Sequence, residues 1–326
     1  MTDKKTIAII TPSLGLGGAE LWARALVTYC QDFNWVVGVL STGNWHSVVA
    51  DGVIAHAAAV HTLAPAVDAV TTHTLTYDVL SATCRNADAV IVWGGGRYWP
   101  LPIRPGVPVI FVGHGTCQWT IKAAAEAKAA GATHMVAVSH AASRVIDQAL
   151  NVPVHTIWNG VDTARLKPPA DVEAVRQAWD PHAYDYAKYV GYIGRLGNEK
   201  NLDSIIHAVA QLPFHYQLVL IGCTGWKSER ILTLARTLLP DRLIEVPATD
   251  NVGEHLGALD CLVQVSPREG HSLTICEAML CKIPIVSTRT GAIPELEEYA
   301  GVELVEAVRD DPLVFEIADA IRRVCI

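Results

Sequence analysis

The amino-acid sequence predicts an α/β fold with two Rossmann-like domains, each built around a parallel sheet. The first observation is that short apolar segments alternate with helical segments along the chain, the pattern of parallel βαβ units. The second is the length of 326 residues, enough for two domains that each bury a core. The third is a composition of 51% hydrophobic and 18% charged residues, which is that of a globular chain.

In the first half of the chain, strands are expected where short apolar runs lie between turn residues. These runs are Thr6–Thr11, Trp35–Leu40, Ala89–Trp93, Val109–Val112, Met135–Ser139 and Val154–Ile157. Helices are expected at Ala19–Cys30, Thr120–Ala130 and His140–Leu150. The Ala- and His-rich segment Asn44–Thr76 has weak periodicity, and no element is assigned to it.

The pattern restarts in the second half of the chain. Strands are expected at Tyr189–Ile193, Gln217–Ile221, Ile244–Val246, Cys261–Val265 and Ile285–Ser287. Helices are expected at Leu202–Gln211, Ser228–Leu239, Val252–Ala258, Ser272–Leu280 and Pro312–Val324. Between the halves, Asn159–Asp185 carries the breaker signals Asn159-Gly160, Lys167-Pro168-Pro169 and Asp180-Pro181. The predicted domains are therefore residues 1–165 and 166–326.

The expected localisation is cytoplasmic, with peripheral attachment to a membrane left open. No apolar run reaches the roughly 18 residues needed to span a bilayer, so no integral membrane segment is expected. The apolar run Thr6–Thr11 after Lys4 and Lys5 is too short for a signal peptide and is interpreted as a first strand. The eight cysteines form no C-x-x-C pair, which favours reduced thiols.

The net charge of −8 lies entirely in the second half of the chain. Residues 1–165 hold 10 acidic and 10 basic residues, whereas residues 166–326 hold 23 and 15. A non-specific grip on nucleic acid needs a basic face, and the composition shows none. Attraction to an anionic membrane is equally unsupported by the composition.

The segment from Ser266 to Glu277 carries the strongest chemical signal. It places Glu269 in the loop after an apolar strand and Glu277, eight residues later, inside the following helix. Gly270 allows the backbone to approach a ligand, and Ser272 suits the N-cap. The amides of His271, Ser272 and Leu273 would then bind an anion such as phosphate. The alternative is a surface loop before a Glu-rich helix.

This segment resembles the E-x7-E signature of retaining glycosyltransferases, and glycosyltransferase family 4 in particular. The resemblance implies the GT-B architecture, in which two Rossmann-like domains have parallel sheets facing across a cleft. By this resemblance, residues 1–165 form the acceptor-binding domain and residues 166–326 bind the nucleotide-sugar donor. It also implies that Glu277 binds the ribose hydroxyls and that Glu269 contacts hydroxyls of the transferred sugar.

A second motif runs from Gly194 to Lys200 directly after a predicted strand and resembles the G-R-L-x-x-E-K motif of the same family. It places the cations Arg195 and Lys200 at the carboxyl end of that strand. Arg suits bidentate phosphate contacts and Lys supplies a point charge, so both are expected to hold the diphosphate. The alternative is a solvated charged turn.

The glycine-rich loop after the first strand fails as a dinucleotide fingerprint. Glu20 stands where the third glycine is needed, and no acidic residue ends the second strand near Leu40. A loop whose amides approach a phosphate remains, with a plain tight turn as the alternative. Gly17 and Gly18 match the family loop that packs over the donor diphosphate.

His114 lies between Gly113 and Gly115, where an apolar strand meets a loop of small residues. Family members often carry a His at this place, near the transferred sugar, although a lone His among apolar residues is also commonly structural. Trp45, Trp99 and Trp119 fall near predicted loops of the first domain and favour an acceptor surface as a group. No D-x-D, H-x-x-x-H or H-E-x-x-H motif occurs, so no metal and no further cofactor are expected.

Together with these patterns, the resemblance implies a retaining, metal-independent glycosyltransferase that moves a hexosyl or related group from a UDP- or GDP-sugar to an acceptor. The predicted catalytic residues are His114, Arg195, Lys200 and Glu269. The predicted donor-binding residues are Gly17, Gly18, Arg195, Lys200, His271, Ser272, Leu273 and Glu277. An epimerase or hydrolase on the same fold, or a binding protein without turnover, are the alternatives. The sequence names neither the sugar nor the base, leaves lipid, glycan, small molecule or nucleic acid open as acceptor, and does not give the oligomeric state.

Overall fold

The computed structural model describes residues 4–14, 17–40, 50, 53–55, 57–62, 69–93, 99–181, 186–223, 228–299, 302–305 and 311–325. The chain divides into two compact units, Met1–Gly160 and Val161–Ile326. Residues 161–165, expected in the first domain, therefore lie with the second. The reason is local: the Arg165 side chain bonds Asp250 and Glu277, which both belong to the second unit.

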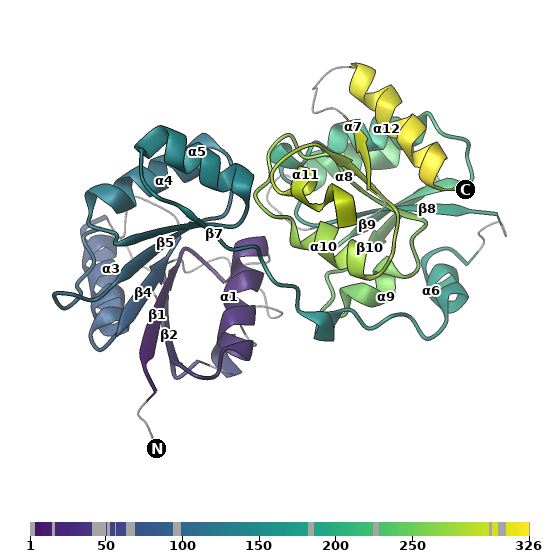
Figure 1. The fold of residues 1–326 in the computed structure, drawn as a ribbon. Helices are drawn as coiled ribbons and strands as arrows, with labels where there is room; N and C mark the ends of the chain where they lie inside the picture. The colour runs from purple at the N-terminus through teal and green to yellow at the C-terminus, as the bar shows by residue number, and fades with distance from the viewer. Residues whose placement is uncertain are drawn as a thin grey trace. The chain divides into compact units, whose positions relative to one another are not determined.

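The first unit is a parallel sheet with strand order β3-β2-β1-β4-β5-β6-β7 (Figure 1). Its strands are β1 (Thr6–Thr11), β2 (Asn34–Val39), β3 (Ala59–Thr62), β4 (Ala89–Val92), β5 (Val109–Gly113), β6 (His134–Ala137) and β7 (His155–Thr156). Its helices are α1 (Gly18–Tyr29), α3 (Ala69–Cys84), α4 (Gln118–Ala129) and α5 (His140–Leu150).

Alternate side chains of β1 show how this sheet is buried on both faces. Ile9 packs into a cluster with Val27 of α1, while its neighbour Ile10 packs into another cluster with Leu80 of α3. Because successive side chains of a strand point to opposite faces, both faces need apolar residues. This requirement explains the nearly continuous apolar runs from which the strands were predicted.

The second unit is a parallel sheet with strand order β10-β9-β8-β11-β12-β13. Its strands are β8 (Lys188–Ile193), β9 (Tyr216–Ile221), β10 (Leu243–Val246), β11 (Cys261–Gln264), β12 (Ile285–Thr288) and β13 (Val302–Val305). Its helices are α6 (Val172–Trp179), α7 (Leu202–Ala210), α8 (Ser228–Leu238), α9 (Val252–Leu256), α10 (Leu273–Leu280), α11 (Ile293–Leu296) and α12 (Asp311–Val324). Short 3₁₀ turns are η1 (Thr163–Arg165), η2 (Asn198–Lys200) and η3 (Glu297–Tyr299).

The same alternation organises the core of the second unit. Val190 and Tyr192 of β8 pack into a cluster that includes residues of α7, α8 and α12. Tyr189 of the same strand packs into the cluster on the other face, with Ile275 of α10. Each face of this sheet is thus covered by its own set of helices.

Several elements were not predicted. β3 falls within the unassigned segment Asn44–Thr76, α3 begins in it, and α6 lies in the expected boundary stretch. The four-residue elements β13 and α11 were also missed. These elements are short or weakly amphipathic, so neighbouring structure decides their conformation more than their own apolar pattern does.

The order of strands marks one point in each sheet where ligands commonly bind. In the first sheet, β1 lies between β2 and β4, and in the second, β8 lies between β9 and β11. Connections therefore leave the central strand in opposite directions, which opens the carboxyl edge of a parallel sheet to a ligand. The loops after β1, β8 and β11 lead to most of the predicted site residues, whereas His114 follows β5.

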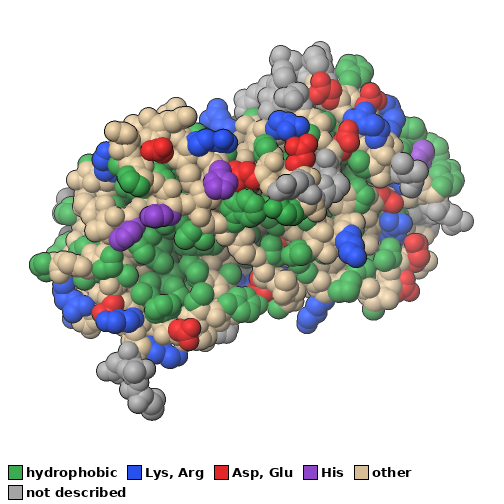
Figure 2. Space-filling view, in the orientation of Figure 1, with side chains coloured by type: hydrophobic (Ala, Val, Ile, Leu, Met, Phe, Trp, Pro, Cys, Tyr) green, Lys and Arg blue, Asp and Glu red, His purple; other side chains and the backbone are tan. Residues whose placement is uncertain are grey.

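The surface carries mixed charge. On the face shown in Figure 2, acidic and basic side chains are intermingled over the second unit, and its described residues form no continuous basic patch there. No helix of the described ranges is long and apolar enough to cross a membrane. The eight cysteines are all free thiols.

Candidate active site

The loops after β8 and β11 bring the predicted cations and one predicted carboxylate to the same edge of the second sheet. The two strands are adjacent, with Val190 opposite Cys261 and Gly191 opposite Leu262. Both strands run in the same direction, so their following loops meet beyond the carboxyl edge. The sequence motifs at Arg195 and at Glu269 are therefore spatial neighbours, as the parallel α/β interpretation requires.

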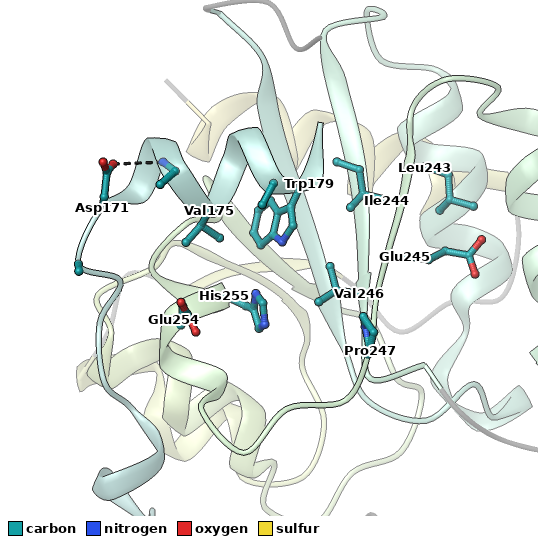
Figure 3. A pocket seen from close by; sticks show the side chains of 13 residues that line it. Asp171, Val175, Trp179, Leu243, Ile244, Glu245, Val246, Pro247, Glu254 and His255 are labelled. Atoms are coloured by element: carbon teal, nitrogen blue, oxygen red, sulfur yellow. Dashed lines mark hydrogen bonds between the residues drawn. The ribbon is translucent and has the colours of Figure 1, made fainter. Parts of the chain in front are cut away.

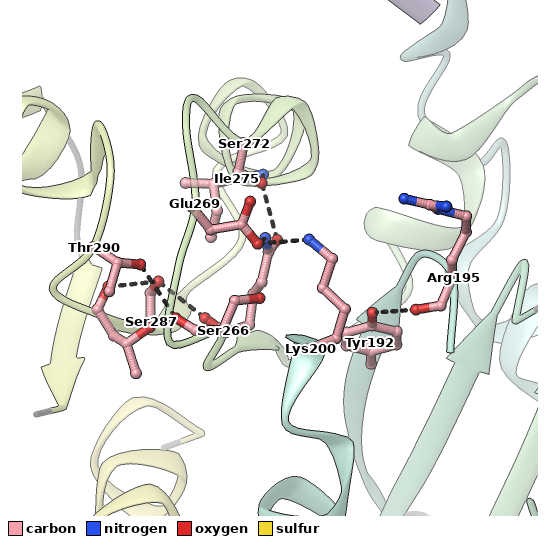
Figure 4. Close-up of polar contacts among 11 residues, drawn as sticks. Tyr192, Arg195, Lys200, Ser266, Glu269, Ser272, Ile275, Ser287 and Thr290 are labelled. Atoms are coloured by element: carbon pink, nitrogen blue, oxygen red, sulfur yellow. Dashed lines mark hydrogen bonds and ion pairs between the residues drawn. The ribbon is translucent and has the colours of Figure 1, made fainter. Parts of the chain in front are cut away.

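Glu269 and Lys200 form the central contact of this edge. Lys200 Nζ lies 2.7 Å from Glu269 Oε1, and Gln264 Nε2 donates to the same oxygen at 3.0 Å. The two charged side chains are only 22% and 14% exposed, and Figure 4 shows them pointing toward each other. The contact is thus partly shielded from water, which makes it stronger than a surface ion pair.

Ser272 is the N-cap of α10, as the sequence predicted. Its Oγ accepts from the amide of Ile275 at 3.3 Å and donates to Gln264 Oε1 at 3.0 Å. Gln264 therefore links the start of α10 to the carboxylate of Glu269. Sequence analysis missed Gln264, and its signal was a buried amide ending an otherwise apolar strand.

Arg195 extends from a loop whose shape is fixed beneath it. Gly194 has φ of 138°, a value that favours glycine, and the buried Tyr192 hydroxyl donates to the Arg195 carbonyl at 2.8 Å. The Arg195 side chain is exposed, and its guanidinium forms no hydrogen bond or ion pair within the described ranges (Figure 4). The loop thus holds an exposed guanidinium in the same turn region of the sequence as Lys200, which pairs with Glu269.

A second loop supports Glu269 from behind. Gly291 has φ of 58°, and a Cβ there would lie 2.5 Å from the Gly270 carbonyl oxygen and 2.7 Å from that of Glu269. The next amide, that of Ala292, donates to the Gly270 carbonyl at 2.8 Å. Thr290 Oγ1 also donates to the Ser266 carbonyl at 3.2 Å (Figure 4). The backbone around Glu269 is therefore held closely against the segment after β12.

Glu277 lies inside α10 and is buried, with 6% of its side chain exposed. Its Oε1 is 3.3 Å from Arg165 Nη1, and Arg165 Nε is 3.1 Å from Asp250 Oδ1. Burial raises the pKa of the Glu277 carboxyl, and the Arg165 charge opposes that rise. Sequence analysis missed Arg165, because no spacing rule connects a residue of the interdomain stretch with one in a helix over a hundred positions later.

The other predicted donor-binding residues of this segment lie at the start of α10. Leu273 is the first helical residue and Ser272 precedes it as the N-cap. His271 is buried; its Nδ1 is 3.7 Å from Cys276 Sγ, and burial lowers the pKa of its imidazole. The helix start thus combines backbone amides with a side chain that burial keeps neutral.

In the first unit, Gly17 is the N-cap of α1 and Gly18 its first residue. A Cβ on Gly17 would meet the Glu20 carboxylate, so that side chain would have to shift to make room for it. Glu20 Oε1 accepts from Ser13 Oγ at 3.0 Å, which ties the start of α1 to the end of β1. These two glycines therefore lie at a helix start beyond the carboxyl edge of the first sheet.

His114 follows β5 and is enclosed by two indole rings. The ring centroids of Trp22 and Trp93 lie 5.0 and 5.6 Å from that of His114, both in edge-to-face orientation. Burial lowers the pKa of His114 to about 4, and its buried Nε2 has no hydrogen-bond partner among the described residues. His114 is thus a neutral imidazole at neutral pH.

The tryptophans expected near loops differ in their placement. Trp119 lies in the first turn of α4 and is 56% exposed, whereas Trp99 packs against apolar clusters. Trp45 lies outside the described residues. Trp22 and Trp93, which the sequence did not single out as loop residues, are the ones that surround His114.

A separate cavity of about 620 Å³ lies in the second unit between α6, the edge strand β10 and α9 (Figure 3). Trp179 and His255, whose rings stack at 5.9 Å, line it together with Ile244, Val246 and Glu254. None of the predicted site residues lines this cavity. Among the described residues, no group of three or more His, Cys, Asp or Glu could hold a metal ion.

The chain thus has two α/β units, each built on a parallel sheet whose carboxyl edge carries the loops described above. This is the architecture of the GT-B class of fold. The chain superposes on Anabaena HepE in complex with UDP and glucose over 98% of its own length and 89% of that chain. The TM-score is 0.80 and the sequence identity 20%. This likeness confirms the predicted fold of two parallel-sheet domains.

The family match lies in the second unit. Residues 187–325 match the family described as "Glycosyl transferases group 1". The chain is 34% identical over 157 residues to the lipopolysaccharide core biosynthesis mannosyltransferase LpsB of Rhizobium meliloti, covering 45% of this chain and 44% of LpsB. It is 26% identical over 143 residues to a GDP-mannose-dependent alpha-mannosyltransferase of Mycobacterium tuberculosis, covering 44% of this chain and 35% of that protein. The matched stretch thus spans less than half the length of these relatives.

Proposed function

We propose that this protein is a retaining glycosyltransferase that takes a sugar from a nucleotide-sugar donor without a metal ion. The observation that carries the proposal is the Lys200–Glu269 pair at the carboxyl edge of a unit whose residues 187–325 match group 1 glycosyl transferases; Arg195 follows the same strand as Lys200. Relatives that share this domain include enzymes named for mannosyl transfer. Either UDP or GDP is the carrier we propose.

Arg195 and Lys200 hold the diphosphate in this proposal. The leaving nucleoside diphosphate gains negative charge as the glycosidic bond breaks, and stabilising such charge lowers the barrier of the chemical step. Arg195 presents a guanidinium with no protein partner in the described ranges, so it is ready for a bidentate phosphate contact. Amides at His271–Leu273 and at Gly17–Gly18 add helix-start contacts of the kind that bind anions.

The two carboxylates bind hydroxyl groups. Glu277 accepts hydrogen bonds from the ribose hydroxyls. Glu269 accepts hydrogen bonds from hydroxyls of the transferred sugar, while Lys200 and Gln264 hold the Glu269 carboxylate in place. His114 supports the reaction as a neutral hydrogen-bonding group, because its low pKa keeps it uncharged at neutral pH. The first unit supplies the acceptor-binding surface.

The experiment is a thermal unfolding series with UDP-glucose, UDP-N-acetylglucosamine and GDP-mannose, each in the presence of EDTA. A donor at a hundred times its Kd adds roughly 2.7 kcal/mol to the free energy of unfolding. One nucleotide series should stabilise the native protein, and Arg195→Ala should remove that shift. Arg322→Ala, which removes an exposed arginine of α12, should leave the shift unchanged.

If none of the sugar nucleotides raises the melting temperature of the native protein, the proposed donor site is wrong. If the donor binds, product analysis with candidate acceptors then separates the activities. Release of free sugar without transfer would indicate a hydrolase, an altered donor sugar would indicate an epimerase, and binding without any product would indicate a non-catalytic protein.

A further inference from the structure

Arg165 is a buried arginine that contacts one buried and one exposed carboxylate. Its Nη1 is 3.3 Å from Glu277 Oε1, and its Nε is 3.1 Å from Asp250 Oδ1. The exposed side-chain fractions are 8% for Arg165, 6% for Glu277 and 56% for Asp250. The Nε group also donates to the Asp250 carbonyl at 3.3 Å. The guanidinium is therefore fixed from both sides.

The 3₁₀ turn that carries Arg165 is itself held in shape. Asp162 is the N-cap of η1, and its Oδ1 accepts from the amide of Ala164 at 3.1 Å. This turn lies near the start of the second unit, which begins at Val161. The position of Arg165, and through it the contact with Glu277, is thus determined by a short rigid segment and not by a flexible side chain alone.

Among the groups that affect the pKa of Glu277, Arg165 is the one that lowers it. Burial raises the pKa of the Glu277 carboxyl, Asp162 raises it further, and Arg165 lowers it. On the same helix, the thiols of Cys276 and Cys281 also have raised pKa values, so they add no negative charge at neutral pH. Without a paired cation, a carboxyl this deeply buried tends to take up a proton.

We propose that Arg165 is a positioning residue that holds the Glu277 carboxylate ionised and oriented to accept the two hydroxyls of a nucleotide ribose. The proposal rests on the donor site proposed above. An ionised carboxylate offers acceptor lone pairs on both oxygens, whereas a protonated one uses an oxygen as a donor. Arg165 contacts Oε1 of the carboxylate and no hydrogen bond or ion pair among the described residues takes up Oε2, so the second oxygen stays available while the first is held.

A purely structural role of Arg165 predicts a different pH dependence of donor binding. If Arg165 only ties η1 to α10, its loss lowers the stability and weakens donor binding by the same factor at every pH. If it holds Glu277 ionised, its loss weakens binding at low pH and the defect fades as the pH rises. The pH dependence of donor affinity therefore separates the two roles.

The experiment measures the Kd of UDP-glucose and GDP-mannose by calorimetry from pH 6 to pH 9 for native protein, Arg165→Met and Arg165→Lys. Sugar nucleotides carry no phosphate group that titrates in this range, and the comparison with native protein at each pH corrects for ionisation of the base N–H at the alkaline end. In Arg165→Met, the pH midpoint of binding should move upward, and the affinity at any pH below both midpoints should fall about tenfold for each pH unit of that shift. Arg165→Lys should keep the midpoint near that of the native protein.

Two further variants act on the same charges without removing the arginine. Asp162→Asn keeps a capping side chain but removes a charge that raises the Glu277 pKa, so the midpoint should move to lower pH. Asp250→Asn removes the exposed partner of Arg165 and should change the Kd less than twofold at any pH. These variants keep the test decisive even if Arg165→Met does not fold.

The outcomes distinguish this inference from the donor site itself. If native protein binds neither sugar nucleotide, the donor site is wrong and this inference falls with it. If native protein binds one of them, but Arg165→Met or Asp162→Asn leaves the midpoint unchanged, Arg165 has no positioning role and the donor site stands.

Discussion

Lys200 Nζ and Glu269 Oε1 lie 2.7 Å apart although the residues are 69 positions apart in the chain. The contact exists because β8 and β11 are neighbours in the sheet, so the loops that follow them share one edge. A donor diphosphate that binds Lys200 would draw this cation toward itself while Glu269 keeps its second donor, Gln264. The pair therefore couples the proposed phosphate contact to the proposed sugar contact.

Replacement of Lys200 by Ala should lower donor affinity by about tenfold to a hundredfold, because a charged hydrogen bond contributes about 1.5–3 kcal/mol. The loss should appear in kcat/KM for transfer as well as in the Kd of the donor. Lys200→Arg should retain part of both. Lys128→Ala removes a lysine that bonds the Leu150 carbonyl in the first unit, and it should leave both quantities unchanged. Equal donor affinity in Lys200→Ala and native protein would contradict the assigned role.

Gly291→Ala should destabilise the second unit by about 1–3 kcal/mol, because φ is 58° there and the added Cβ meets the backbone of Glu269 and Gly270. Urea unfolding measures the change. Donor affinity should fall as well, since the clash displaces the segment that carries Glu269. Gly160→Ala is the matched control, because a Cβ at Gly160 meets nothing within 4 Å. Two variants of equal stability would show that the loop after β12 does not constrain Glu269.

Much of this edge was predictable because its residues follow strands with clear apolar patterns. Arg195, Lys200 and Glu269 each lie in a loop directly after such a strand or one short turn later. Ser272 was predicted as an N-cap from its residue type and place, and the structure confirms it. Parallel strands then bring such loops together by topology, so sequence order alone was enough to expect that these residues share an edge.

The missed residues depend on contacts that no local pattern encodes. Gln264 is buried at the end of β11 and bridges Ser272 to Glu269, while Arg165, near the start of the second unit, contacts Glu277, which lies 112 positions later in the chain. Each is a polar side chain whose partner is set by packing. The two indole rings around His114 likewise come from α1 and from the residue after β4. These segments are far apart in the chain and meet only when the first unit folds.

Gln264→Leu should lower kcat/KM for transfer more than it lowers donor affinity. The substitution removes the second hydrogen bond to Glu269 and leaves the Ser272 hydroxyl with one partner fewer. Loss of such buried hydrogen bonds typically costs about 1–3 kcal/mol of stability, so the denaturation midpoint should also fall. Gln211→Leu, at the end of α7 and away from this network, is the matched control. A drop in donor affinity alone would mean that Gln264 does not orient Glu269.

The His114 imidazole should make the protein less stable as the pH falls below about 6.5. Its pKa is about 4 in the folded protein and near 6.5 when unfolded, so the unfolded chain binds more protons between these values. The stability is fully present above pH 6.5 and is lost progressively down to pH 4, by about 3 kcal/mol in total. Urea unfolding at pH 7, 5.5 and 4.5 measures the effect for native protein, His114→Gln and the exposed control His134→Gln. His114→Gln should remove this part of the acid sensitivity, whereas His134→Gln should retain it.

The same low pKa means that kcat/KM for transfer should show no inflection from His114 between pH 6 and pH 8. Such an inflection, present in native protein and absent in His114→Gln, would show that the imidazole is charged near neutral pH and hence open to solvent.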